Sequence, residues 1–121
     1  MSNSSNAKNV TIYHNPRCGT SRTTLALLEE RGITPDVNLY MDTPPDAATL
    51  QDLLVKLGFS SAQQLIRTKE DLYKEMKLAD ASEQALIDAM IQHPKLIERP
   101  IVIVGNKARL GRPPENVLDI L

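Results

Sequence analysis

A short β-branched run, a polar loop and a helical pattern follow one another near the start of the chain, and this order constrains the fold most. Val10–Tyr13 has the composition of a β-strand and ends at the loop-forming residues His14–Pro16. A helical pattern opens at Gly19–Ser21 and stops at Gly32, and Val37–Tyr40 is a second candidate strand. Because all three elements fit into about 30 residues, they predict a β-α-β unit with parallel strands.

Helical patterns fill the middle of the chain. Four leucines at i, i+3, i+4 and i+7 predict an amphipathic helix that ends at Gly58. They are Leu50, Leu53, Leu54 and Leu57. Ser60 and Gln63 resemble a capping box for a short helix that reaches Ile66. Further helices are predicted over residues 70–77 and 82–92, so a helical insertion occupies about residues 46–95.

The C-terminal part predicts a β-hairpin followed by a helix. Ile101–Val104 is the most apolar run, Gly105-Asn106 is a turn signal, and Lys107–Leu110 returns as an antiparallel strand. Pro113-Pro114 starts a last helix, whose predicted inward side chains are Val117, Leu118 and Leu121. The whole pattern predicts an α/β fold with a four-stranded mixed sheet and the helical insertion.

The length and net charge of the chain limit the classes of protein to which it can belong. With 121 residues, we expect a single domain over residues 9–121 after a disordered polar tail at residues 1–8. The 14 basic and 15 acidic side chains leave a net charge of −1, which gives no general attraction to nucleic acid or membrane. The sequence opens without a hydrophobic secretion segment and has one cysteine, so we expect a cytoplasmic protein. A monomer is one possible oligomeric state, which the sequence does not determine.

Cys18 is the main candidate for chemistry. A lone cysteine is often an inert core residue, but this one lies in a polar loop at the predicted N-terminus of a helix. The helix dipole and free amides there favour a thiolate and bind oxyanions. The supporting residues of this loop are His14, Asn15, Gly19, Thr20 and Ser21. The pattern therefore favours a nucleophilic cysteine that faces an anionic substrate.

Spacing excludes two related classes of thiol enzyme. A dithiol oxidoreductase has a second cysteine three residues after the first, where this chain has Ser21. A phosphatase loop has an arginine six residues after the cysteine, where this chain has Thr24. The remaining interpretation is a monothiol nucleophile whose reaction an external thiol completes.

Histidines and arginines provide the other candidate groups. His14 and His93 do not have metal-ligand spacing with Cys18, so no metal site and no bound cofactor are expected. His14 could bind the loop or the sulfur, or be purely structural.

Three arginines lie at the edges of predicted elements, where guanidinium groups suit oxyanions, although solvated surface arginines remain the alternative. They are Arg67, Arg99 and Arg112, whereas Arg22 and Arg31 fit an exposed helix face.

Three motifs in order resemble those of the glutaredoxin-coupled arsenate reductases. They are the segments Tyr13–Arg22, Ile91–Val102 and Leu110–Leu121. The resemblance extends from about Val10 to the end of the sequence and is to the short chromosomal members of the family. It implies a thioredoxin-like fold with a helical insertion. That fold has a cis-proline before its third strand, so we predict a cis Arg99–Pro100 bond.

The resemblance also implies roles. Cys18 matches the nucleophile that attacks arsenate, and Arg67, Arg99 and Arg112 match the residues that bind the oxyanion. His14 matches the histidine beside the cysteine. Glutathione is the implied co-substrate and glutaredoxin the transient partner. Two other functions remain open: a redox regulator of the same fold that binds RNA polymerase, and a glutathione-dependent thiol-transfer enzyme.

Overall fold

The computed structural model describes residues 9–121, and the polar tail predicted at residues 1–8 lies outside them. The described chain divides into two compact units. The first joins the segment ending at Leu39 to Arg99–Leu121, and the second is Tyr40–Glu98. The expectation that both units belong to one domain stays a prediction.

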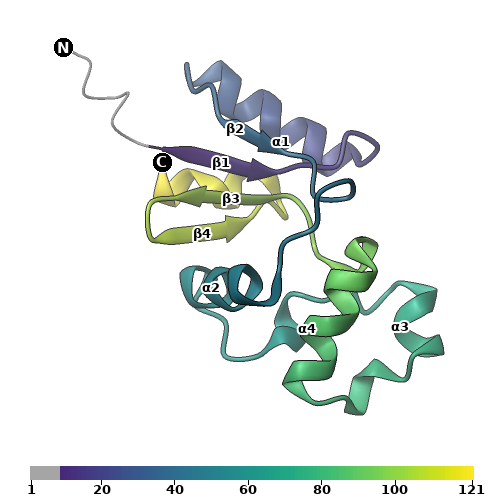
Figure 1. Ribbon diagram of the computed structural model, residues 1–121. Coiled ribbons are helices and arrows are strands. Elements are labelled where there is room, and N and C mark those ends of the chain that lie inside the picture. Colours follow the sequence, from purple (N-terminus) through teal and green to yellow (C-terminus); the bar gives the residue numbers. More distant parts are fainter. Residues whose placement is uncertain (1–8) are drawn as a thin grey trace. The chain divides into compact units, whose positions relative to one another are not determined.

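A four-stranded mixed sheet forms the centre of the first unit (Figure 1). Its strands are β1 (Val10–Tyr13), β2 (Asp36–Asn38), β3 (Ile101–Val104) and β4 (Lys107–Leu110). The strand order is β2-β1-β3-β4, with β1 and β2 parallel and the other two pairs antiparallel. The predicted β-α-β unit and hairpin are therefore confirmed, and the arrangement is thioredoxin-like.

The second strand is shorter than predicted and begins one residue earlier. β2 pairs only with residues 11–13 of β1, and the His14 N–H donates to the Asn38 carbonyl at 2.9 Å as the last bond between them. Because β1 turns into a loop at this point, Leu39 and Tyr40 have no strand left to pair with. Their apolar character misled the sequence analysis, since pairing and not hydropathy ends a strand.

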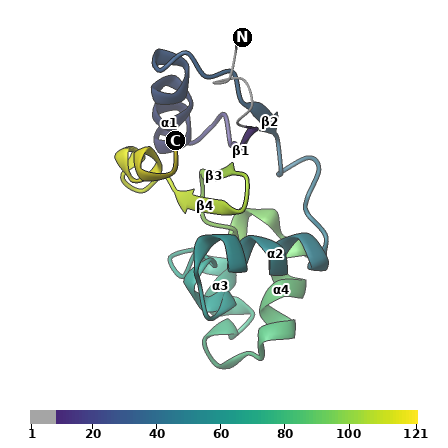
Figure 2. The same cartoon turned by 90° about the vertical axis from the view of Figure 1, so that its left-hand side faces the viewer.

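Two helices cover one face of the sheet, α1 (Gly19–Glu30) and the 3-10 helix η5 (Pro114–Ile120) (Figure 2). The buried side chains between them and the sheet are Val10, Ile12, Leu28, Val102, Val117 and Ile120. Of the other two side chains predicted to face inward, Leu121 is partly buried and packs against this cluster, whereas Leu118 is half-buried and is not among the residues packed against it. A 3-10 helix has three residues per turn, so Val117 and Ile120 share its inner side.

The second unit contains the predicted helical insertion. It begins with α2 (Ala47–Leu57), whose N-terminus is capped by Asp46 and whose four predicted leucines are buried. The next helix, η2 (Ala62–Gln64), begins one residue later than expected. The capping box is made by Ser61 and Gln64, and not by Ser60 and Gln63.

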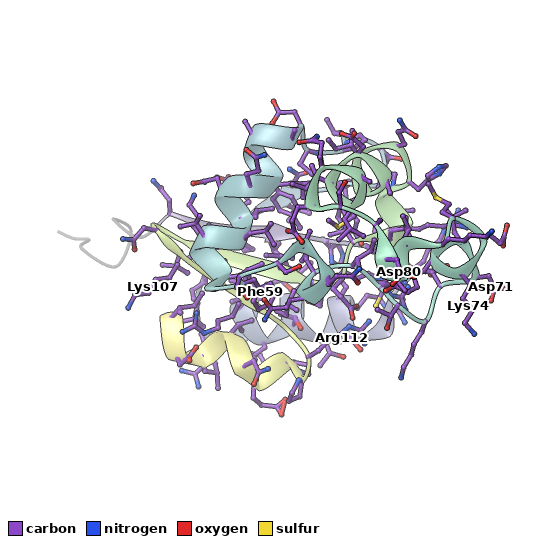
Figure 3. The ribbon with its side chains drawn as sticks, turned by 90° about the horizontal axis from the view of Figure 1, so that it is seen from below. Phe59, Asp71, Lys74, Asp80, Lys107 and Arg112 are labelled. Carbon is purple, nitrogen blue, oxygen red and sulfur yellow. The ribbon has the colours of Figure 1, made fainter. Side chains whose placement is uncertain are left out.

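Four short helices complete this unit: α3 (Asp71–Glu75), η3 (Leu78–Asp80), α4 (Glu83–Gln92) and η4 (Pro94–Leu96). α3 is shorter than predicted because Lys77 has a φ of 54°, which lies outside the helical region. Its side chains Asp71 and Lys74, with Asp80 of η3, lie on the outside of the unit (Figure 3). No helix in the described part of the chain is both long and apolar enough to cross a membrane.

Candidate active site

Strand register brings three chain segments together at one end of the sheet. Tyr13 of β1, Ile101 of β3 and Leu110 of β4 are paired side by side (Figure 1). The chain therefore continues from Tyr13 into the cysteine loop, enters β3 through Pro100, and leaves β4 through Gly111 at the same end. The Arg99–Pro100 peptide bond is cis, as predicted, and Arg112–Pro113 is also cis.

The loop that carries Cys18 is shaped by Asn15. The Asn15 side-chain oxygen accepts a hydrogen bond from the Arg17 N–H at 3.0 Å. The backbone carbonyl of Asn15 accepts one from the Cys18 N–H, also at 3.0 Å. Cys18 is half-buried and is the N-cap residue of α1, whose first turn contains no acidic side chain. The cysteine therefore lies where the helix dipole favours a negative charge, as the sequence predicted.

A buried pair, His14 and Ser21, holds the loop against α1. The His14 Nδ1 lies 2.7 Å from the Ser21 hydroxyl oxygen, which also accepts the Asn15 N–H at 3.0 Å. Burial, followed by the positive charge of Arg22, lowers the pKa of His14 and so disfavours the charged imidazolium. The structure thus shows His14 bonded to Ser21 of α1, and any role beside the sulfur stays a prediction.

Two of the three predicted arginines converge on the cysteine. The Arg112 Nε donates to the Arg99 carbonyl at 2.8 Å, which orients the guanidinium. Its Nη2 then lies 3.7 Å from the Cys18 sulfur (Arg112 is labelled in Figure 3). Arg99 also interacts with the thiol through its charge and by hydrogen bonding.

The surroundings of Cys18 favour its thiolate. Burial raises the pKa of the thiol, but the Ser21 backbone N–H and the Arg99 and Arg112 side chains outweigh that effect. The pKa of Cys18 is consequently below its ordinary value. A thiolate next to two guanidinium groups is an arrangement that can bind an anion and attack it.

Gly111 is a site residue that the sequence analysis missed. A Cβ at this position would lie 2.6 Å from the Thr24 Oγ1 and 2.7 Å from the Pro100 Cγ, so only glycine fits between them. The Gly111 N–H donates to the Pro100 carbonyl at 2.9 Å. Its φ is not positive and no turn requires it, so the sequence contained no signal for this close approach.

The supporting roles expected of the loop residues Gly19 and Thr20 stay predictions. A Cβ at Gly19 would make only an ordinary contact, 3.7 Å from the Arg22 Nη2, so this glycine is not sterically required. Thr20 contributes its carbonyl, which accepts the Thr24 hydroxyl at 2.9 Å. No group of three or more His, Cys, Asp or Glu side chains in residues 9–121 is arranged to hold a metal ion.

Arg67 belongs to the helical unit and differs from the other two arginines. It pairs with Glu70 at 2.9 Å and with Glu98 at 3.5 Å. Its backbone N–H donates to the Leu96 carbonyl, next to the bridge between Ile66 and Ile97. Two carboxylates therefore balance its charge within its own unit, and its predicted contact with an oxyanion stays a prediction.

Comparison with known proteins identifies the family. The sequence model of the ArsC family matches residues 13–120. This chain belongs to the ArsC family. An arsenate reductase from Haemophilus influenzae is 51% identical over 93% of this chain and 98% of its own length. An uncharacterized protein from Escherichia coli K12 is 63% identical, over 94% of this chain and 98% of its own.

A solved structure agrees with both the family and the fold. The arsenate reductase from Vibrio cholerae superposes with a TM-score of 0.92 at 52% identity, covering 94% of this chain and 98% of that one. The ArsC-family fold predicted from the three motifs is thus confirmed. The Cys18 loop, Arg99 and Arg112 all lie within the span that the family model matches.

Proposed function

We propose that this protein is an arsenate reductase in which Cys18 is the nucleophile. The observation that carries the proposal is the 3.7 Å contact between the Cys18 sulfur and the Arg112 guanidinium, together with the lowered pKa of that thiol. The same geometry meets both requirements of attack on an anion. It supplies a thiolate, and it supplies positive charge where the substrate's oxygens would lie.

In the first step the Cys18 thiolate attacks the arsenic atom. A sulfur–arsenic bond forms, and one arsenate oxygen leaves as water after protonation. Repulsion between thiolate and substrate opposes this approach, and the Arg99 and Arg112 guanidinium groups with the amides of α1 offset it. Arg67 is a third candidate ligand, but its pairing with two glutamates predicts a smaller contribution than that of Arg112.

An external thiol must complete the reduction, because the chain contains one cysteine. Reduction of arsenate to arsenite takes two electrons, so two thiols become one disulfide while arsenate loses one oxygen as water. Cys18 supplies one sulfur, and glutathione supplies the second. Glutaredoxin then reduces the mixed disulfide and returns the Cys18 thiol. This chemistry suits the cytoplasm, where thiols are kept reduced.

The test is arsenate-dependent oxidation of NADPH in a system coupled through glutathione, glutaredoxin and glutathione reductase. We expect turnover with the native chain and none with the Cys18→Ser variant, because a serine hydroxyl without a nearby base is a poor nucleophile. A thiol-transfer enzyme, which the same low-pKa cysteine would also serve, would reduce small disulfides but leave arsenate unchanged. That result would overturn the proposal.

A further inference from the structure

Two more arginines, Arg17 and Arg22, lie next to Cys18, and the proposed attack on arsenate does not use them. Both are exposed. Arg17 directly precedes the cysteine, and Arg22 lies one helical turn beyond it, where its backbone N–H donates to the Cys18 carbonyl. Neither forms an ion pair with any carboxylate of residues 9–121. Their charges are thus uncompensated within the described protein.

The structure holds these two residues in place by different means. The Arg22 Nη1 donates to the Pro16 carbonyl at 2.8 Å, and its Nη2 lies 3.7 Å from the position of a Cβ on Gly19. Its guanidinium therefore lies against the residues on either side of Arg17 and Cys18. The Arg17 backbone is fixed by the bond from its N–H to Asn15, while its side chain extends into solvent.

The positive charges of Arg17 and Arg22 act on any charged molecule that approaches the Cys18 sulfur. Arg99 and Arg112 are the arginines that act on the Cys18 thiol, whereas Arg17 is exposed and is not among the groups that shift its pKa. An exposed guanidinium attracts anions at a distance, and its planar fork binds a carboxylate with two hydrogen bonds. The molecule that must reach the cysteine after arsenate is the thiol co-substrate.

We propose that Arg17, supported by Arg22, recognises a carboxylate of an anionic thiol co-substrate of the glutathione class as that thiol approaches Cys18. Glutathione fits because it has two carboxylates and one ammonium group, and so approaches with net negative charge. The inference rests on the proposed function, in which Cys18 exchanges sulfur with such a thiol. It adds the residue that selects this thiol over neutral or cationic ones.

Disulfide exchange tests the proposal without arsenate. The Cys18 thiolate attacks glutathione disulfide, a bond between the two sulfurs forms, the original disulfide bond breaks, and one glutathione leaves as its thiolate. We would measure the second-order rate constant of this reaction by loss of the free thiol, and compare it with that for the neutral bis(2-hydroxyethyl) disulfide. The ratio of the two constants cancels any change in the thiolate fraction of Cys18.

The Arg17→Ala variant should lower this ratio about threefold to fivefold at low ionic strength, the size expected for one exposed charge pair. Arg17→Glu should lower it about tenfold, and high salt should reduce both effects because it screens exposed charges. The matched control is Arg31→Ala, which removes the same charge at the other end of α1 and should leave the ratio unchanged.

Three outcomes would overturn the inference: an unchanged ratio in both Arg17 variants, an equal fall in Arg31→Ala, or an effect seen with glutaredoxin but not with glutathione disulfide. The last result would assign Arg17 to a protein partner. These outcomes are separate from the fate of the proposed function. A chain that does not reduce arsenate can still show the Arg17-dependent ratio, and one that reduces arsenate can lack it.

Discussion

Cys18 shows how the pKa of one side chain is set by a neighbour close in sequence and by two that are distant. Burial alone would make it an inert thiol, since desolvation disfavours the thiolate and raises the pKa. The Ser21 N–H, Arg99 and Arg112 reverse that effect. The lowered pKa of Cys18 therefore depends on three groups that all stabilise the same negative charge.

The pH dependence of Cys18 alkylation checks this balance. The thiolate is the reactive form, so the rate rises with pH and reaches half its maximum at the pKa of the thiol. Because the pKa is lowered, we expect that midpoint below the usual value of about 8.5. Iodoacetamide labelling followed by mass spectrometry measures it. A midpoint at or above the usual value would contradict the anion site.

Removal of Arg112 should affect both the thiol and the reaction. In Arg112→Ala we expect the midpoint of alkylation to move to higher pH, because a charge that lowers the pKa is lost. The value of kcat/KM for arsenate should also fall. The fall should correspond to a loss of about 2–4 kcal/mol of transition-state stabilisation, the range for one such donor. The same loss is expected for Arg99→Ala and a smaller one for Arg67→Ala. Full activity in all three variants would refute the oxyanion site.

At the scale of elements, the site depends on how the loop is attached to α1. The Ser21 side chain is fully buried and bonds both to His14 and to the Asn15 N–H. The position where a dithiol enzyme has its second cysteine is therefore a structural support in this protein.

The variant Ser21→Ala should lower the free energy of unfolding by about 1–3 kcal/mol, because it leaves two buried polar groups without a partner. Urea denaturation measures the change. Thr23→Ala, on the exposed side of the same helix, is the control and should change stability much less. If the two variants were equally stable, the His14–Ser21 bond would have no structural importance.

The approach of β4 to α1 gives a second prediction at this scale. A methyl group at position 111 would overlap Thr24 and Pro100, so Gly111→Ala should destabilise the fold by about 1–3 kcal/mol, as overpacking does. It should also displace Arg112 and slow Cys18 alkylation. Gly19→Ala is the control, since its added methyl meets only an ordinary contact. Thermal unfolding compares the two, and equal stability would contradict the close packing.

At the scale of the whole molecule, the 121 residues contain one cysteine, so the proposed mechanism requires a second thiol from another molecule. We expect arsenate turnover with glutathione and glutaredoxin, and little with thioredoxin and its reductase alone, because no second thiol can form an internal disulfide for thioredoxin to reduce. The coupled NADPH assay with each donor system measures this. Equal rates with both systems would rule out the external-thiol mechanism.

Local patterns were sufficient to predict most of the elements. The four leucines of α2 and the polar loop between β1 and α1 each depend on residues close in sequence, and the structure confirms both. The predicted ends of elements were wrong where they depended on strand pairing or where two adjacent residues satisfied the same pattern. β2 ends because β1 turns away, and the capping box of η2 begins one residue late because two adjacent serines, Ser60 and Ser61, satisfy the same pattern.

The sequence by itself determined that Cys18 would lie at a helix N-terminus and have no partner cysteine, because both facts depend on neighbouring residues and composition. Only the tertiary structure decided which arginine faces it. Arg112 is 94 residues from Cys18 in sequence. It reaches the sulfur because the strand register places the end of β1, the start of β3 and the end of β4 side by side. A hydrogen bond from the Arg112 Nε to the Arg99 carbonyl then orients the Arg112 guanidinium toward the sulfur. Such a contact depends on strand pairing across the sheet, which no local pattern of residues specifies.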